Sequence, residues 1–323
     1  MLNKQQNGFT LIELMVSILI GLFLLAGTFT IYLNSRESQR VIDEEVRMMD
    51  NARFALESIA FDLRHAGGYG HHNHEGQANV RDEEKFTTVT GQCGVADSGW
   101  VVDLNRPVFA VDDATDYSPG CMGDWVSGDT LEMRYGVALP VGIDETTDLS
   151  ANLLYLKSVA DYAYMFKGSA LPSATQFNDK PNVRFFIWQA RGYYIANHTD
   201  TAGDGVPSLR LVSLEPGPTV SETVLLRGVE DLQVKIGLDI PLLGETQGDE
   251  SVDAYKNPSD VSAWNQAIAA RIWLVVRSEN EFPDIAKNTP YEVAGVVKTF
   301  DDQYKRIVVS ATVRLRNANT GDI

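Results

Sequence analysis

The chain has 323 residues, of which 44% are hydrophobic, so it is long enough to bury one large core or two smaller ones. Its 44 acidic and 27 basic side chains give a formal net charge of −17. Because the phosphates of nucleic acids demand a basic surface, this charge argues against a nucleic-acid-binding protein and against a DNA-uptake function.

The first predicted element is a membrane-spanning helix. No charged side chain occurs from Leu14 to Leu33. Roughly 20 residues at about 1.5 Å each cross a hydrocarbon core of about 30 Å. The exception near the start is Glu13, and a carboxylate at membrane depth costs on the order of 2.5–3.5 kcal/mol. The sequence therefore predicts a transmembrane helix over residues 9–33, with an acid that requires a partner.

The residues before this helix differ from an ordinary secretory signal, because the apolar region is too long and no small-residue cleavage site follows it. A short polar leader, residues 1–8, carries Lys4 and ends in Gly8, with Phe9 directly after it. This order of glycine, hydrophobe and then Glu13 resembles the class III signal of type IV prepilins. The resemblance implies that a prepilin peptidase cleaves between Gly8 and Phe9 and methylates Phe9. The alternative is a plain signal anchor with one stray glutamate.

Glu13 has a physical role under this interpretation. The new ammonium on Phe9 of one subunit can pair with Glu13 of a neighbour inside a low-dielectric bundle, so we expect Glu13 to be an assembly residue. Lys4 precedes the apolar run, and positive charge is retained on the cytoplasmic side. We therefore expect anchoring in the inner membrane, with everything after Leu33 in the periplasm.

The helical pattern continues beyond the membrane segment. Apolar residues recur every three or four positions as far as Ala66, which is one continuous stripe. Gly67 and Gly68 then supply a C-terminal stop. We expect a single helix of about 87 Å from Phe9 to Ala66, whose second half, residues 34–67, is amphipathic and lies against a globular head.

The chain contains two cysteines, Cys93 and Cys121. Outside the cytoplasm two thiols at this spacing are expected to pair. A disulfide closing a loop of about 30 residues contributes roughly 3–4 kcal/mol through chain entropy. Two buried free thiols are the alternative.

The remaining residues, 68–323, are predicted to form a β-rich head. Residues 69–129 are rich in Gly, Asp, Asn and His, which predicts an irregular region with one or two short strands. A short helix is expected over residues 260–269, carrying Trp264 toward the core. The clearest strand is 305–316, where apolar and polar residues alternate. The other strand candidates are 130–139, 153–159, 183–196, 208–214, 223–226, 233–238 and 271–277.

Landmarks at the start, middle and end of the chain resemble those of the PilW family of minor pilins. They are Asn51-Ala52-Arg53-Phe54-Ala55-Leu56, Asp62-Leu63-Arg64-His65-Ala66-Gly67, Leu226-Arg227-Gly228-Val229-Glu230-Asp231-Leu232-Gln233-Val234 and Arg314-Leu315-Arg316-Asn317. The sequence departs from the family near Gly70, where His71 follows instead of a cysteine. The resemblance implies an α+β, type IV pilin-like fold, with the long helix packed on the head.

The resemblance also implies a function. A PilW-type minor pilin joins other minor pilins in a complex that primes type IV pilus assembly and sits at the tip. Its implied partners are the major pilin and a tip adhesin of the PilY type. Twitching motility and cell adhesion follow from the pilus. A pseudopilin of the J class from type II secretion shares the leader, the long helix and a large head, and it is the main alternative.

Two groups of residues are weak candidates for metal ligands. His71, His72 and His74 form the densest imidazole cluster, but glycines and asparagines flank them. Asp200 and Asp204 resemble an oxygen-rich calcium turn, but their spacing departs from that of an EF-hand. We interpret both groups as solvated loops and expect no metal and no cofactor.

Motifs for catalysis are missing from the sequence. It contains no G-x-S-x-G elbow, no H-E-x-x-H, no phosphate-binding glycine loop and no C-x-x-C. A Ser-His-Asp arrangement around His198 is the one enzymatic possibility that spacing leaves open. We expect a non-enzymatic protein, with a membrane-tethered periplasmic enzyme or metal-binding protein as the less favoured alternative.

Overall fold

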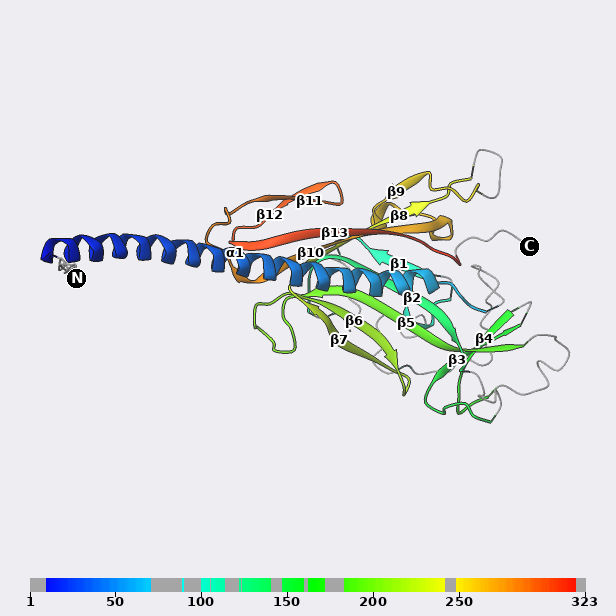
Figure 1. The fold of residues 1–323 in the computed structure, drawn as a ribbon. Helices are drawn as coiled ribbons and strands as arrows, with labels where there is room; N and C mark the ends of the chain where they lie inside the picture. Colours follow the sequence, from blue (N-terminus) through cyan, green and yellow to red (C-terminus); the bar gives the residue numbers. More distant parts are fainter. Residues whose placement is uncertain are drawn as a thin grey trace, which may run out of the picture. The chain divides into compact units, whose positions relative to one another are not determined.

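The computed structural model describes residues 10–70, 89, 100–104, 106–113, 122, 124–140, 147–159, 162–171, 183–241 and 248–317 (Figure 1). The chain divides into two compact units, Met1–Met49 and Asp50–Ile323. The boundary falls inside the one long helix, α1, which runs from Leu11 to His65 and has 55 residues.

The first unit is the N-terminal part of α1. Its large apolar side chains from Leu11 to Leu33 are exposed in the isolated chain. In the described part of the chain, α1 is the one helix that is long and apolar enough to span a membrane. The predicted continuous helix is thus confirmed from Leu11 to His65, whereas Phe9 and residues 1–8 lie outside the described residues.

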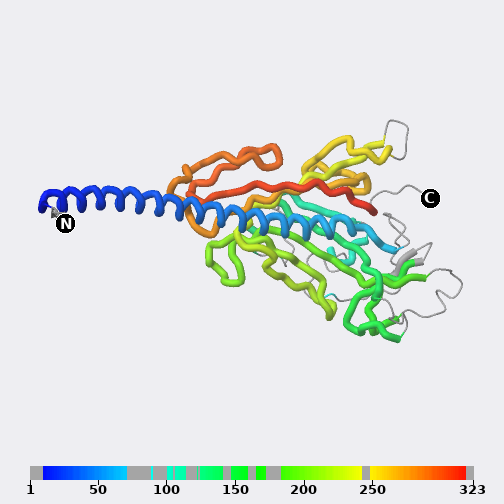
Figure 2. The backbone as a smooth tube through the Cα atoms, in the orientation of Figure 1, coloured from blue at the N-terminus to red at the C-terminus, as the bar shows by residue number. Residues whose placement is uncertain are grey.

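The second unit contains two main antiparallel sheets. The larger sheet has seven strands in the order β1-β2-β5-β3-β4, with β6 added to β5 and β7 to β6. The smaller sheet has the order β13-β10-β8-β9, and β11 and β12 form a separate hairpin. Figure 2 follows the backbone through both sheets.

The strands of the larger sheet are β1 (Val108–Val111), β2 (Trp125–Ala138), β3 (Leu154–Val159), β4 (Tyr162–Lys167), β5 (Arg184–Ala196), β6 (Ser208–Glu215) and β7 (Thr219–Arg227). The remaining strands are β8 (Val229–Leu238), β9 (Ala254–Lys256), β10 (Ala267–Glu281), β11 (Pro290–Val293), β12 (Val296–Thr299) and β13 (Tyr304–Arg314). Short 3-10 turns occur at Trp100–Val102, Pro258–Asp260 and Trp264–Gln266.

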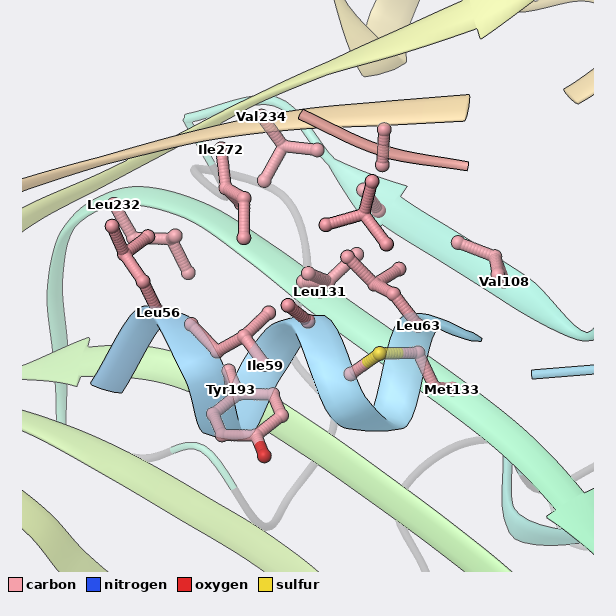
Figure 3. Close-up of a cluster of buried hydrophobic side chains, with 14 of the residues drawn as sticks. Leu56, Ile59, Leu63, Val108, Leu131, Met133, Tyr193, Leu232, Val234 and Ile272 are labelled. Atoms are coloured by element: carbon pink, nitrogen blue, oxygen red, sulfur yellow. The ribbon is translucent and has the colours of Figure 1, made fainter. Parts of the chain in front are cut away.

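The last turns of α1 form the centre of the core of this unit. Ile59 and Leu63 are fully buried, and they pack with Leu131 of β2 and Ile272 of β10 (Figure 3). The same cluster includes Tyr193 of β5, so one apolar stripe of the helix contacts strands of both sheets. Burial of this stripe, at about 25 cal/mol per Å², explains why the helix pattern had to continue past the membrane segment.

The opposite face of the seven-stranded sheet has its own core. Trp188 and Tyr194 of β5 alternate with Tyr193, and they pack with Trp100 and Val101 of a 3-10 turn. The Trp188 indole N–H donates to the Val101 carbonyl at 2.7 Å. Both faces of β5 are therefore buried, which accounts for the aromatic run in its sequence.

Most predicted strands are present, with changes at their ends. The strand predicted over 223–226 is the longer β7, and the one predicted over 271–277 is β10, which begins at Ala267. The short helix predicted over 260–269 is wrong, because two 3-10 turns occupy its first part and β10 its last. Trp264 is half-buried against the core, with its ring centroid 5.0 Å from that of Phe109. Strands β4, β9, β11 and β12 were not predicted.

Replacing Ile59 by alanine tests the role of α1 in the core. Because the Ile59 side chain is fully buried between the sheets, its truncation should lower the free energy of unfolding by about 2–5 kcal/mol. Chemical unfolding of the full chain in detergent, followed by tryptophan fluorescence, measures this. Phe54→Ala is the matched control, since Phe54 is 56% exposed on the same helix, and should cost about 0.5 kcal/mol or less. Equal effects of the two substitutions would contradict the packing.

Candidate functional site: the two ends of the long helix

The first turn of α1 is closed by a capping box formed by Thr10 and Glu13. The Glu13 Oε2 atom accepts hydrogen bonds from the Thr10 backbone N–H and from the Thr10 hydroxyl, both at 2.9 Å. In return the Glu13 N–H donates to the Thr10 Oγ1 atom at 3.3 Å. This reciprocal pattern satisfies donors that a helix start otherwise leaves unpaired.

The capping box gives Glu13 a second role beside the one expected from the sequence. In a single chain its carboxylate is held by Thr10, so the acid has hydrogen bonds of its own without a second subunit. The cap supplies no positive charge, however, so the electrostatic requirement for a cationic partner at membrane depth remains. The residues of the predicted cleavage site, Gly8 and Phe9, lie outside the described residues.

At the other end of the helix, a buried carboxylate connects α1 to the larger sheet. Asp62 is fully buried. Its two oxygens accept hydrogen bonds from the Tyr135 hydroxyl at 2.7 Å and the Tyr193 hydroxyl at 2.5 Å. The Arg191 guanidinium lies 3.3 Å from the same carboxylate. We call these four residues the helix anchor.

The electrostatics of the helix anchor favour one charge state. Burial, together with the negative charge of Asp62, raises the pKa of Tyr135 and of Tyr193, so both phenols stay protonated and donate. Arg191 supplies the compensating positive charge. A buried carboxylate with a cation and two hydroxyl donors is satisfied, whereas removal of the carboxylate alone would leave its partners unpaired.

The sequence contains a signal for the helix anchor that our prediction did not use. Asp62 lies within the apolar stripe of α1. Its neighbours in the stripe are Ile59 before it and Leu63 and Ala66 after it. An acid within a buried stripe needs a partner on the element that the stripe contacts. The tyrosines that meet it could not be chosen from the sequence, because strand register decides which side chains face the helix.

The end of α1 is capped by a residue from the far end of the chain. The Asn317 side-chain amide donates to the backbone carbonyls of His65 and Ala66, both at 3.2 Å. Gly67 follows with a φ of +78°, and its N–H donates to the Arg134 carbonyl of β2 at 2.9 Å. The second and last landmarks of the family resemblance therefore meet in space, where they stop the helix.

The central landmark holds the hairpin β11–β12 and its connections. Arg306 donates to Glu230 at 2.5 Å and to Asp302 at 2.6 Å, and both contacts are shielded from solvent on the arginine side. Lys298 of β12 forms an ion pair with Asp231, which is buried. These acids thus position the hairpin on the smaller sheet.

A further buried acid, Asp129, joins the two sheets. Its carboxylate accepts the Asp113 N–H at 3.0 Å and the Val234 N–H of β8 at 2.7 Å. Burial raises the pKa of Asp129 to about 7, and the backbone hydrogen bonds only partly oppose this.

Of the weak metal candidates, Asp200 and Asp204 lie among the described residues. The Asp204 carboxylate is occupied by the backbone N–H groups of Thr199 and Val206 and by the Thr199 hydroxyl, which lowers the pKa of Asp204. Asp200 is exposed in the same turn. In the described residues no group of three His, Cys, Asp or Glu side chains is placed to hold an ion. His71, His72 and His74 lie outside those residues, as do Cys93 and Cys121.

The surroundings of His198 differ from those of a catalytic triad. Its Nε2 atom lies 3.1 Å from Asp124, and its Nδ1 atom faces the Thr199 carbonyl and Arg210. The Ser208 hydroxyl donates to the backbone carbonyl of His198 instead of the ring. In a catalytic triad the nucleophilic serine contacts the imidazole, whereas Ser208 contacts the backbone of His198.

Replacing Asp62 by alanine tests the helix anchor. Because the change removes the acceptor of the buried Tyr135 hydroxyl and the counter-charge of Arg191, and leaves Tyr193 only its 3.4 Å contact with the Ser58 hydroxyl, it should destabilise the head by about 3–5 kcal/mol. Chemical unfolding of the full chain measures the loss. Glu57→Ala on the exposed side of the same helix is the control and should change stability by about 0.5 kcal/mol or less. A near-neutral Asp62→Ala would contradict the anchor.

The raised pKa of Asp129 predicts a dependence of stability on pH. Between the unfolded pKa, near 4, and the folded value of about 7, the folded state binds one more proton than the unfolded state. This contribution to the free energy of unfolding is therefore full below pH 4 and falls as the pH rises toward 7. Asp129→Asn should flatten this part of the profile by an amount on the order of a few kcal/mol. Exposed Asp284→Asn is the control, and parallel profiles for wild type and Asp129→Asn would refute the assignment.

Two family models match the chain, one at the start of the long helix and one over the C-terminal half of the head. Residues 3–29 match the family model described as the prokaryotic N-terminal methylation motif. Residues 192–317, which include β8, β10, β13 and Asn317, match the model described as type IV pilus-assembly protein W.

Other comparisons are weaker. No curated protein matches the chain at a significant level. A type IV-like pilin from Thermus thermophilus is distantly similar in structure, with 12% identity, a TM-score of 0.34, and coverage of 86% of this chain and 98% of that one. The chain is thus similar to two pilin-related family models, at the helix start and over the C-terminal part of the head.

Proposed function

We propose that this protein is a minor pilin that helps to prime type IV pilus assembly and joins the pilus, at its tip, with other minor pilins. The observation that carries the proposal is a single acid, Glu13, at the start of an uncharged helix that lies within the prepilin methylation motif. A carboxylate in that position is costly for a solitary anchor and useful for a subunit that meets another amino terminus.

The proposed pathway begins in the inner membrane. Prepilin peptidase removes residues 1–8, and the new amino terminus at Phe9 is methylated. The head occupies the periplasm until assembly carries it to the pilus and the cell surface. In that oxidising compartment Cys93 and Cys121 pair, and the protein needs no cofactor.

In the proposed mechanism the helix and the head have different roles. The uncharged part of α1 stacks on neighbouring helices, and Glu13 sets the register through the ammonium of an adjacent subunit. The head selects partners among other minor pilins, the major pilin and a PilY-type adhesin. No catalytic step is required. The match of residues 192–317 to a pilus-assembly family favours this function over that of a J-class pseudopilin.

Substitutions of Glu13 can separate its cap from its charge. Glu13→Gln keeps a side chain that can complete the capping box but removes the negative charge, whereas Glu13→Val removes both. If the charge sets the register, both variants should reach the membrane normally, and both should be recovered in sheared pili at roughly a tenth of the wild-type amount or less. Immunoblots of membrane and pilus fractions measure this.

The matched control for the cap is Thr10→Val, which removes the hydroxyl from the capping box and leaves the charge of Glu13 intact. This variant should enter pili at a level closer to that of wild type. Wild-type incorporation of Glu13→Gln would show that the cap alone matters, and it would overturn the proposed role of the charge.

A further inference from the structure

The outer face of the smaller sheet carries cations and aromatic rings, although the whole chain has a net charge of −17. On β8, β10 and β13 the side chains that do not enter the core alternate with those that do. We call the following residues the basic-aromatic face: Gln233, Lys235, Tyr255, Arg271, Trp273 and Thr312. None of them is fully buried.

The centre of the basic-aromatic face is a pair of cations on adjacent strands. Arg271 of β10 is in direct register with Lys235 of β8 on one side and Thr312 of β13 on the other. Like charges directly opposite each other destabilise a sheet unless an anion lies between them. Among the described residues, no acidic side chain forms an ion pair with either Lys235 or Arg271.

The guanidinium of Arg271 is held in one position. Its carbon lies 4.5 Å from the ring centroid of Tyr255 and 5.9 Å from that of Trp273. Its Nε–H donates to the Thr312 hydroxyl at 3.0 Å. Stacking on aromatic rings fixes the plane of the fork, which is the arrangement that suits recognition of a carboxylate by an arginine.

Two acids at the border of the basic-aromatic face are held in ion pairs. Asp231 pairs with Lys298 of the hairpin, and Glu250 lies 3.2 Å from Arg314. Figure 1 shows the hairpin β11–β12 and the pair β8–β9 near the two ends of β13. The pair of Lys235 and Arg271 thus carries a local positive charge between two acids, Asp231 and Glu250, that other cations already pair.

We propose that the basic-aromatic face binds the carboxylates of an acidic loop on a neighbouring pilin-like subunit, an inference that rests on the proposed function. Arg271 would bind one carboxylate through its fork, Lys235 would neutralise a second, and Trp273 would supply the apolar contact typical of interface centres. The charge complementarity is local, so the partner's acids must project onto this face.

A nucleic acid fits the face less well. Its phosphates are evenly spaced along a long polymer, which would extend from the two free cations onto the surface of a chain with a charge of −17. A short acidic segment of a protein can contact the basic-aromatic face without extending onto the acidic surface around it. The partner is therefore an acidic polypeptide.

The test uses the full chain in detergent and a short capped oligoglutamate peptide as the probe, with binding measured by calorimetry. Wild type should bind the peptide, and added salt should weaken the affinity. Arg271→Glu and Lys235→Glu should each reduce affinity about tenfold or more, since each removes a charge-assisted contact. Lys287→Glu, at an exposed lysine outside the face, should leave it unchanged. Lys235→Glu guards against misfolding of the Arg271 variant, because the stacking on Tyr255 and Trp273 and the hydrogen bond to Thr312 are made by Arg271 and stay intact in the Lys235 variant.

Two further experiments complete the test. The first identifies the chemical class of the ligand, and the second distinguishes failure of this inference from failure of the proposed function. Oligoglutamine of the same length should not bind, and tighter binding of single-stranded DNA than of oligoglutamate would overturn the acidic-polypeptide assignment. In cells, the double variant Lys235→Glu/Arg271→Glu should lose its leader normally but fail to co-purify with the other minor pilins. If wild type and double variant co-purify equally, the inference fails and the proposed function stands, whereas a wild-type chain that keeps its leader contradicts the function itself.

Discussion

The absence of charge from Leu14 to Leu33 is the constraint on which the rest of the molecule depends. A helix that is apolar on every side cannot be covered by a small head and instead requires a hydrocarbon phase or other helices of the same kind. The one acid at its start, Glu13, is hydrogen-bonded by Thr10 within the chain. Those bonds satisfy a carboxylate oxygen of Glu13 but do not neutralise its negative charge. The helix start is therefore capped within the chain, and the carboxylate still attracts a cation.

The head is built around the other end of the same helix. Its last turns provide the apolar stripe on which both sheets pack, and Asp62 adds a buried polar link to β2 and β5. An apolar stripe alone tolerates sliding and rotation, whereas a carboxylate that must meet two hydroxyls and a guanidinium defines one register. Asn317 closes the helix end, which makes the C-terminal strand part of the same structure.

The spacing of apolar residues along the sequence predicted those elements in which a single helical or alternating period dominates. The helix from Leu11 to His65 and the alternating strand β13 follow from such periods, and so does the buried β5. The pattern was insufficient where the chain changes direction. Residues 260–269 contain turn-forming and apolar residues together, and long-range pairing with β8 decided in favour of a strand from Ala267. The helix anchor required knowledge of which tyrosines face Asp62, and register supplies that only in three dimensions.

The central claim is that the chain is a prepilin whose mature form begins at the residue that meets a neighbouring Glu13. Mass spectrometry of the N-terminal peptide, taken from protein purified out of native membranes, tests this claim most directly. The account predicts a peptide that starts at Phe9 and carries one methyl group on its amine. A peptide that retains residues 1–8, or one that begins at any later position, would contradict it.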